Sequence, residues 1–211
     1  MAKTTNTIIT IARQFGSGGR EIGQKLAEDY GIKCYDKELL ARAAKDSGMC
    51  QELFENHDEK PTNSFLYSLV MDTYSMGYSA SGYAEMPLNH KVFLAQFNAI
   101  KDIADEGPCV IVGRCADYAL ADYPNRVSVF IYGNMDSKIR RIAQKYDLTN
   151  AKAKDLMIKT DKKRSSYYNY YTSKKWNDPA SYDLCINSSI CGIDGTVKLI
   201  EEFVSIKEAC S

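Results

Sequence analysis

The sequence predicts an α/β fold in which helices cover both faces of a central parallel sheet. Two observations carry this prediction. Short apolar runs rich in β-branched residues alternate along the chain with segments whose apolar residues recur at helical spacing. The runs are continuously apolar, which is typical of parallel strands buried on both faces. Because 211 residues suffice for one such core and a small subdomain, we expect residues 1–211 to form a single domain.

The first predicted elements are a strand, a glycine-rich turn and a helix. Residues 7–11 read as a short β-branched strand, and residues 13–20 form the turn. Apolar residues at helical spacing follow between Ile22 and Tyr30, and a second helix over residues 37–46 ends at Gly48. Residues 51–90 are polar and aromatic, with a Ser/Gly-rich piece at 79–82. We interpret them as an inserted helical region with a mobile loop.

The second half continues the alternation of strands and helices. We expect a helix over residues 92–106 that Gly107 and Pro108 stop, then a helix over 136–146 and a long helix from 150 toward 171. Asp194 is predicted to cap a final helix. The remaining strands are predicted at residues 109–112, 127–131 and 184–187.

Composition and charge exclude several classes of protein. Lys+Arg and Asp+Glu each total 27, so the formal net charge is zero. A nucleic-acid or anionic-membrane binder usually carries a basic excess, so we expect neither partner and any anion site must be a local cluster. No apolar run approaches the roughly 18 residues of a membrane span, and the N-terminal run is too short for a signal peptide. We therefore expect a cytoplasmic location.

The cysteines are expected to be reduced and structural. There are seven, their spacing is scattered, and no CxxC pair occurs. This pattern supports neither a zinc site nor a thioredoxin-like motif. We therefore expect buried free thiols in a reducing compartment and no resident metal site.

The glycine-rich turn is the first candidate site. Between a strand and a helix, such a turn presents free backbone N–H groups at the positive end of the helix dipole, which binds phosphate. The turn departs from the GxxxxGK[ST] pattern, because Arg13 occupies the first glycine position and Gly19 the lysine position. It also fails the dinucleotide pattern G-x-G-x-x-G. The predicted phosphate-binding residues are Gly16, Ser17, Gly18, Gly19, Arg20 and Glu21.

Two interpretations of Arg20 stay open. In the first, Arg20 replaces the missing lysine as the cation on the phosphates, with a bidentate fork instead of a point charge. Glu21 then lies near the position where a hydroxyl would help to hold Mg²⁺. In the second, the segment is only a tight turn and Arg20 is a solvated surface residue.

Four ordered segments together resemble the cytidylate-kinase-like proteins, relatives of bacterial cytidylate kinase in which the loop reads GSGGR. The matching segments are residues 9–23, 35–40, 110–118, and a C-terminal block made of 167–171, Trp176 and 182–188, so the resemblance leaves out little besides residues 50–90. It implies a P-loop NTPase fold of three layers, with a helical insertion on the acceptor side at 51–90 and a lid at 150–180. It also implies that ATP with Mg²⁺ donates a phosphoryl group to a nucleoside monophosphate, with a CMP-like acceptor favoured.

Phosphoryl transfer needs positioning and positive charge around the transferring oxygens. Asp161 and Arg164 lie on one face of a predicted helix, because residues three apart are neighbours there. They resemble the acid and arginine of the cytidylate kinase lid, and we predict that they are catalytic together with Arg20. Lys163 beside them is predicted to bind substrate. A solvated charged helix face is the alternative.

Arg114 and Asp36 are the other predicted substrate-binding residues. Arg114 follows an apolar strand and so lies at a carboxyl end, where α/β sheets bind ligands. The matching arginine of cytidylate kinases contacts the acceptor monophosphate, but Val112 and Cys115 stand where those enzymes have acids, which puts cytidine specificity in doubt. A structural ion pair is the alternative for Arg114. Asp36 resembles the acid of the acceptor loop and could orient an acceptor hydroxyl or hold Mg²⁺, or simply cap a helix.

Three functions remain open at this point. The first is a kinase acting on a nucleotide, the second a nucleotide-binding protein that has lost catalysis, and the third a kinase with a non-nucleotide small-molecule acceptor. The aromatic residues Tyr167, Tyr168, Tyr170, Tyr171 and Trp176 could stack on a base or pack in the core. The expected partners are a nucleotide and a small-molecule acceptor, and a homodimer is left open.

Overall fold

A parallel sheet forms the centre of the computed structural model, which describes residues 4–59 and 86–210. In this part of the chain the strand order is β2-β3-β1-β4-β5, and every neighbouring pair is parallel. Ile9 of the central strand pairs with Val110 on one side and with Val127 on the other. The strands are β1 (Ile8–Arg13), β2 (Lys33–Tyr35), β3 (Cys109–Val112), β4 (Arg126–Tyr132) and β5 (Leu184–Asn187).

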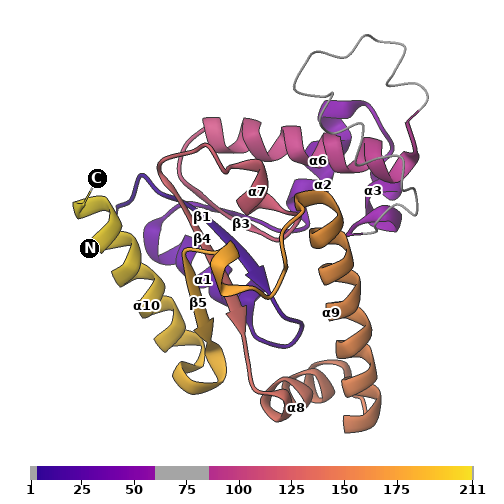
Figure 1. The fold of residues 1–211 in the computed structure, drawn as a ribbon, viewed down its shortest axis with the longest axis vertical. Helices are drawn as coiled ribbons and strands as arrows, with labels where there is room; N and C mark the ends of the chain where they lie inside the picture. Colours follow the sequence, from indigo (N-terminus) through magenta and orange to yellow (C-terminus); the bar gives the residue numbers. More distant parts are fainter. Residues whose placement is uncertain (1–3, 60–85, 211) are drawn as a thin grey trace.

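Helices cover both faces of this sheet, which confirms the predicted α/β class (Figure 1). On one face, Leu26 of α1 and Ile200 of α10 pack against Val129 and its neighbours. On the other face, Leu39 of α2 and Ile100 of α6 pack against Ile111. The helices are α1 (Gly19–Tyr30), α2 (Glu38–Ser47), α3 (Gln51–His57), α6 (Leu88–Asp105), α7 (Ala116–Ala119), α8 (Met135–Tyr146), α9 (Asn150–Thr172) and α10 (Ser188–Ala209), with a 3₁₀ turn at Pro179–Ser181.

The aromatic residues at the end of α9 pack in the core. Tyr171 stacks on Phe93 of α6 with ring centroids 3.9 Å apart, and Trp176 meets Phe130 of β4 edge to face. Tyr167, Tyr168 and Tyr171 are each 3% exposed. These contacts anchor the C-terminal end of α9, while its N-terminal end extends with α8 away from the body of the protein (Figure 1).

Several local predictions need correction. The last helix begins at Ser188 and is capped by Asn187, whose side chain accepts from the Ser189 N–H, so Asp194 is not its N-cap. Gly192 interrupts this helix with a non-helical backbone, and Asp194 after the interruption pairs with Lys25. Asp36 does not cap α2, whose N-cap position is Lys37.

The structure describes part of the predicted insertion and all seven cysteines. Within the predicted insertion, α3 covers Gln51–His57, and the Ser/Gly-rich piece at 79–82 lies outside the described residues. All seven cysteines are free thiols, and those at 109 and 115 are buried. In residues 4–59 and 86–210, no helix is long and apolar enough to span a membrane.

Candidate functional site

The site begins at the junction of β1 and α1. Gly16 and Gly18 adopt the left-handed backbone, at φ 85° and 82°. A side chain at Gly18 would overlap Ile193, and one at Gly16 would come within 3.0 Å of the Lys138 carbonyl oxygen. The first N–H groups of any helix lack an intrahelical acceptor, and no side chain caps those of α1. They therefore suit an anion, so the loop fits a phosphate group.

Ser17 and Glu21 use their side chains away from the anion position. The Ser17 hydroxyl is buried and donates to the Gln14 carbonyl at 2.8 Å, while Ser188 Oγ donates to the Ser17 carbonyl at 2.6 Å. These bonds shape the loop and tie it to the start of α10. The Glu21 carboxylate accepts from Arg141 Nη1 at 3.1 Å and is half exposed. Only the backbone of these predicted residues belongs to the cradle.

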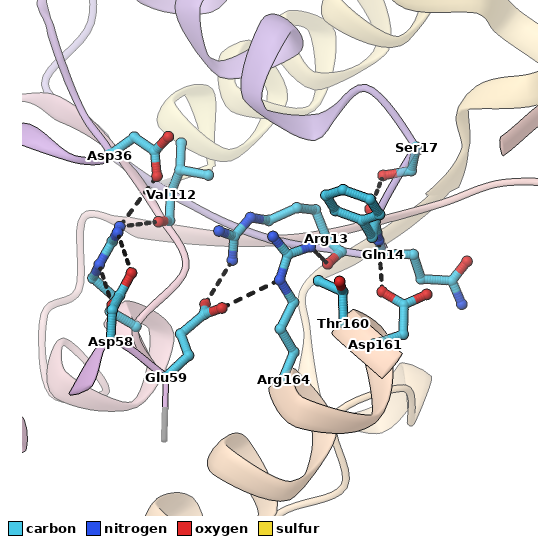
Figure 2. Close-up of polar contacts among 12 residues, drawn as sticks. Arg13, Gln14, Ser17, Asp36, Asp58, Glu59, Val112, Thr160, Asp161 and Arg164 are labelled. Carbon is cyan, nitrogen blue, oxygen red and sulfur yellow. Dashed lines mark hydrogen bonds and ion pairs between the residues drawn. The ribbon is translucent and has the colours of Figure 1, made fainter. Parts of the chain in front are cut away.

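Helix α9, which the sequence predicts to belong to a lid, touches the loop through the predicted acid and arginine. Asp161 Oδ1 accepts from the Phe15 N–H at 2.6 Å, and its other oxygen lies 3.6 Å from the buried Lys138 Nζ. Burial raises the pKa of the Asp161 carboxyl, although the Phe15 N–H and the charge of Lys138 oppose that rise. Arg164 Nη1 donates to the Arg13 carbonyl at 3.2 Å. Their shared face therefore points at the loop, as Figure 2 shows.

A carboxylate bridges two guanidinium groups at the centre of the site (Figure 2). Arg13 Nη1 donates to Glu59 Oε1 at 3.0 Å, and Arg164 Nε donates to Glu59 Oε2 at 3.2 Å. All three side chains are 11–13% exposed. Burial alone would raise the pKa of Glu59, but the charges of Arg13, Arg164 and Arg114 outweigh it and hold the pKa well below its ordinary range. Burial lowers the pKa of Arg164, and the nearby Arg13 adds to that effect.

Two glycines make room for the Arg13 side chain. A Cβ at Gly19 would lie 2.6 Å from Arg13 Cβ, and one at Gly113 would overlap the guanidinium itself. Gly113 also has a positive φ of 83°. Arg13 is therefore held in a slot whose walls are the glycine loop and the end of β3.

Arg114 is buried in a cluster of acids. Its Nη1 donates to Asp36 Oδ1 and the Val112 carbonyl, at 3.1 and 3.2 Å. Its Nε and Nη2 form a fork on Asp58 at 3.1 and 2.9 Å. Burial opposes the charge of Arg114, but the carboxylates of Asp58, Glu59 and Asp36 raise its pKa above the usual value. Asp36 also lies 3.1 Å from Arg20 Nε, whose side chain is 45% exposed.

Two cavities meet at the arginines of the site and Glu59. An open cleft of about 300 Å³ is lined by the glycine loop, Arg20 and Asp36. A small inner cavity of about 20 Å³ reaches Asp117 and Tyr168. There the Tyr168 hydroxyl donates to Asp117 Oδ2 at 2.6 Å, and burial raises the pKa of the Asp117 carboxyl. Four residues line both cavities, namely Arg13, Glu59, Arg114 and Arg164.

The topology explains why arginines from distant segments meet here. The strands β1 and β3 are neighbours, but α1 and α7 that follow them lie on opposite faces of the sheet. The carboxyl ends of two such strands border a crevice, which is where open α/β sheets bind ligands. Arg13 ends β1 and Arg114 follows β3.

Most of the predicted side chains line the cleft or the loop, with one exception. Lys163 is exposed and does not line the cleft, so its role in binding substrate stays a prediction. Sequence reasoning missed Arg13, Asp58, Glu59 and Lys138. Arg13 ends a strand, and the argument used for Arg114 could have found it. No local signal indicates Glu59, because its partners lie far away in sequence.

Magnesium would need carboxylates beside bound phosphates. Among the described residues, no group of three or more acids, histidines or cysteines could hold a metal ion. Mg²⁺ at phosphoryl-transfer sites is usually held by one or two carboxylates together with the substrate phosphates. Asp36 and Asp58 line the cleft and are chemically suited to that part.

Comparisons with known proteins place the chain in a family. None of the curated proteins matches it. An uncharacterized protein from Eubacterium ventriosum is 32% identical, with a TM-score of 0.71 over 94% of this chain and 98% of that one. Shikimate kinases from Bacteroides thetaiotaomicron and Aquifex aeolicus are 14% and 15% identical, with TM-scores of 0.54 and 0.50. The alignments cover 94% and 96% of this chain and 98% of each kinase.

At that identity the shikimate kinases show the fold alone, which is the P-loop NTPase fold that the sequence predicted. The model of the cytidylate kinase-like family matches residues 8–190. The glycine loop, the Gly113-Arg114 segment, the predicted lid at 150–180 and the start of α10 all lie inside this match. The chain therefore belongs to the cytidylate kinase-like family.

Proposed function

We propose that the protein transfers a phosphoryl group from ATP to a small acceptor in the cleft, with a nucleoside monophosphate of the CMP type as the first candidate. One observation carries the proposal. The glycine loop at the N-terminus of α1 faces a cleft lined by five arginines from separate segments. Phosphoryl transfer is catalysed by positioning and by such positive charge. These arginines are Arg13, Arg20, Arg114, Arg141 and Arg164.

The residues of the chain would divide the work as follows. ATP bound with Mg²⁺ would supply the phosphoryl group. The N–H groups at the start of α1 would bind its phosphates, and Arg20 on the first turn would provide the cation that a lysine provides in the ordinary loop pattern. Arg164 would add positive charge from the lid side. Asp36 would orient the acceptor hydroxyl or help to hold Mg²⁺.

A second candidate is a kinase with a non-nucleotide acceptor. Val112 and Cys115 are buried apolar or thiol side chains where cytidylate kinases have acids. Arg114 is already neutralised by two carboxylates, which weakens its claim on an acceptor phosphate. The inner cavity offers Asp117 and a tyrosine hydroxyl, which suit a neutral polar group. Shikimate kinase is the activity named for two structural neighbours, so shikimate belongs among the compounds to be tested.

An ATP turnover assay with a panel of acceptors separates these functions. Fastest turnover with CMP supports the first candidate, and turnover with shikimate or another non-nucleotide supports the second. A protein without catalysis would turn over none of them but would gain thermal stability in ATP.

Replacing Arg20 tests the assignment of the catalytic cation. Arg20→Ala is expected to lower turnover by roughly 10²–10³-fold, the usual loss for one donor to developing negative charge. Arg42→Ala is a matched control, because Arg42 is also partly exposed and forms surface ion pairs with Asp46 and Glu106 away from the cleft. If Arg20→Ala binds and turns over ATP as Arg42→Ala does, the assignment of Arg20 is wrong.

A further inference from the structure

Glu59 occupies an unusual position for a carboxylate in a cleft suited to anions. It lies where the open cleft and the inner cavity meet, and each of its oxygens accepts from a different arginine. Two oxygens held by two guanidinium groups reproduce the way in which proteins bind phosphate. Figure 2 shows the carboxylate between Arg13 and Arg164.

The two arginines have supports that do not depend on Glu59. Arg13 lies in the slot between Gly19 and Gly113. Arg164 donates to the Arg13 carbonyl, and its guanidinium lies 5.6 Å from the centre of the Phe15 ring. Both guanidinium groups would therefore keep their places if the carboxylate left.

Charge favours a second negative charge at this point. Arg114 is balanced by Asp36 and Asp58, both of which it contacts directly. Arg13 and Arg164 share the single carboxylate of Glu59 in direct ion pairs. Asp161 also acts on Arg164 through its charge, but it is itself paired with Lys138, so the direct pairs give Arg13 and Arg164 one carboxylate between them. A phosphoryl dianion would neutralise the pair completely, and two guanidinium forks match its oxygens better than one carboxylate does.

We infer that Arg13 and Arg164 form a binding site for a phosphoryl group, and that Glu59 occupies this site in the ligand-free protein and competes with the ligand. The inference rests on the proposed function for the source of the phosphoryl group, which belongs to the donor or to the acceptor. It gives roles to two further residues: Arg13 binds the phosphoryl group, and the carboxylate of Glu59 competes with that group for the site. Because the inner cavity has room for about one water molecule, a ligand that reaches it must displace the Glu59 side chain.

Binding of inorganic pyrophosphate tests this inference without any turnover. Glu59→Gln keeps the shape of the side chain and removes its charge, so we expect the full-length variant to bind pyrophosphate roughly tenfold more tightly by isothermal titration calorimetry. The matched control is Glu52→Gln, an exposed glutamate on α3, which should bind as the unaltered protein does. Arg13→Gln should weaken binding and should remove the gain when combined with Glu59→Gln.

A merely structural ion pair predicts the opposite result. If Glu59 only holds the arginines in place, Glu59→Gln binds pyrophosphate equally or more weakly, and the inference is wrong. Should Glu59→Gln fail to fold, Glu59→Asp provides the test. Its shorter carboxylate cannot reach both arginines, so this variant should also bind pyrophosphate more tightly than the unaltered protein does. Unchanged or weaker binding by Glu59→Asp would likewise overturn the inference.

Two further titrations identify the source of the phosphoryl group. If Glu59→Gln binds ATP more tightly but CMP as before, the site belongs to the donor. If it binds CMP more tightly but ATP as before, the site belongs to the acceptor. The result is separable from the proposed function. A chain without kinase activity would still show the gain for pyrophosphate, whereas an active kinase that shows no gain would refute only the competing role of Glu59.

Discussion

Replacing Gly113 with alanine should damage the site, whereas the same replacement at a glycine of similar backbone conformation outside the site should not. The backbone of Gly113 has φ 83°, where any other residue is strained by roughly 1–2 kcal/mol. The new methyl group would also overlap the Arg13 guanidinium and displace it from Glu59. Losing that largely buried, charged hydrogen bond should cost about 1.5–3 kcal/mol more. The total expected loss of unfolding free energy is therefore about 2.5–5 kcal/mol.

Gly48→Ala separates the two contributions. Gly48 has φ 68°, and nothing lies within 4 Å of an added Cβ, so only the backbone strain applies. For a chain of this length, 1 kcal/mol shifts the melting temperature by about 2–4 °C. Gly113→Ala should therefore melt about 3–12 °C below Gly48→Ala in differential scanning calorimetry, and it alone should bind pyrophosphate more weakly. Equal melting temperatures and equal pyrophosphate binding in the two variants would refute the slot described for Arg13.

Three further predictions concern buried polar groups. Tyr168→Phe removes the donor to buried Asp117 and should cost about 1–3 kcal/mol in urea unfolding. Lys138→Met removes the cation beside Asp161 and should lower stability by about 1.5–3 kcal/mol in guanidinium chloride. Burial lowers the pKa of His90 from 6.5 to about 3, so the unfolded chain binds the proton more tightly. Between pH 6.5 and about 3, His90 should lower stability by about 1.4 kcal/mol per pH unit as the pH falls, and His90→Gln should remove that contribution.

Surface residues of the same types serve as controls for the tyrosine and lysine variants. Tyr146→Phe and Lys152→Met alter exposed side chains and should each change stability by less than about 0.5 kcal/mol. Losses equal to those of Tyr168→Phe and Lys138→Met would contradict the roles given to the buried groups. For His90, the comparison is made by urea unfolding at pH 7 and pH 5. A constant difference between the unaltered protein and His90→Gln would show that the histidine does not carry the pH dependence.

The regular elements could be predicted because their signals are local. The strands Cys109–Val112 and Leu184–Asn187 have the bounds that the apolar runs indicate. The long helix was expected from residue 150 toward 171 and spans Asn150–Thr172. The first strand runs two residues beyond its predicted end to include Arg13, since a charged residue gives no strand signal. The position of the Arg13 side chain depends on Gly113, a hundred positions away in the sequence.

The site could be predicted only where its residues share an element or follow a strand. Asp161 and Arg164 share a face because helical spacing is a property of the local sequence. The direction of that face, toward the glycine loop, depends on how α9 packs on the rest of the protein. Glu59 lies 105 positions from Arg164, and no pattern in either segment indicates that they meet. Lys138 is different, because it lies one helical turn before the buried Ile142 and could have been recognised on that face.

The hydrogen bond from Ser188 to the Ser17 carbonyl has a consequence for how the protein is made. The two residues are 171 positions apart, so the loop lacks this support until the ribosome has also synthesised Ser188. At translation rates of about 5–20 residues per second, the interval is roughly 10–30 s. During part of that time the central strand β1 also lacks β4, its partner strand from the second half of the chain. A nascent chain that stops before α10 would therefore carry the glycine loop without its hydrogen bond from Ser188, so full phosphate affinity should appear only after α10 has been synthesised.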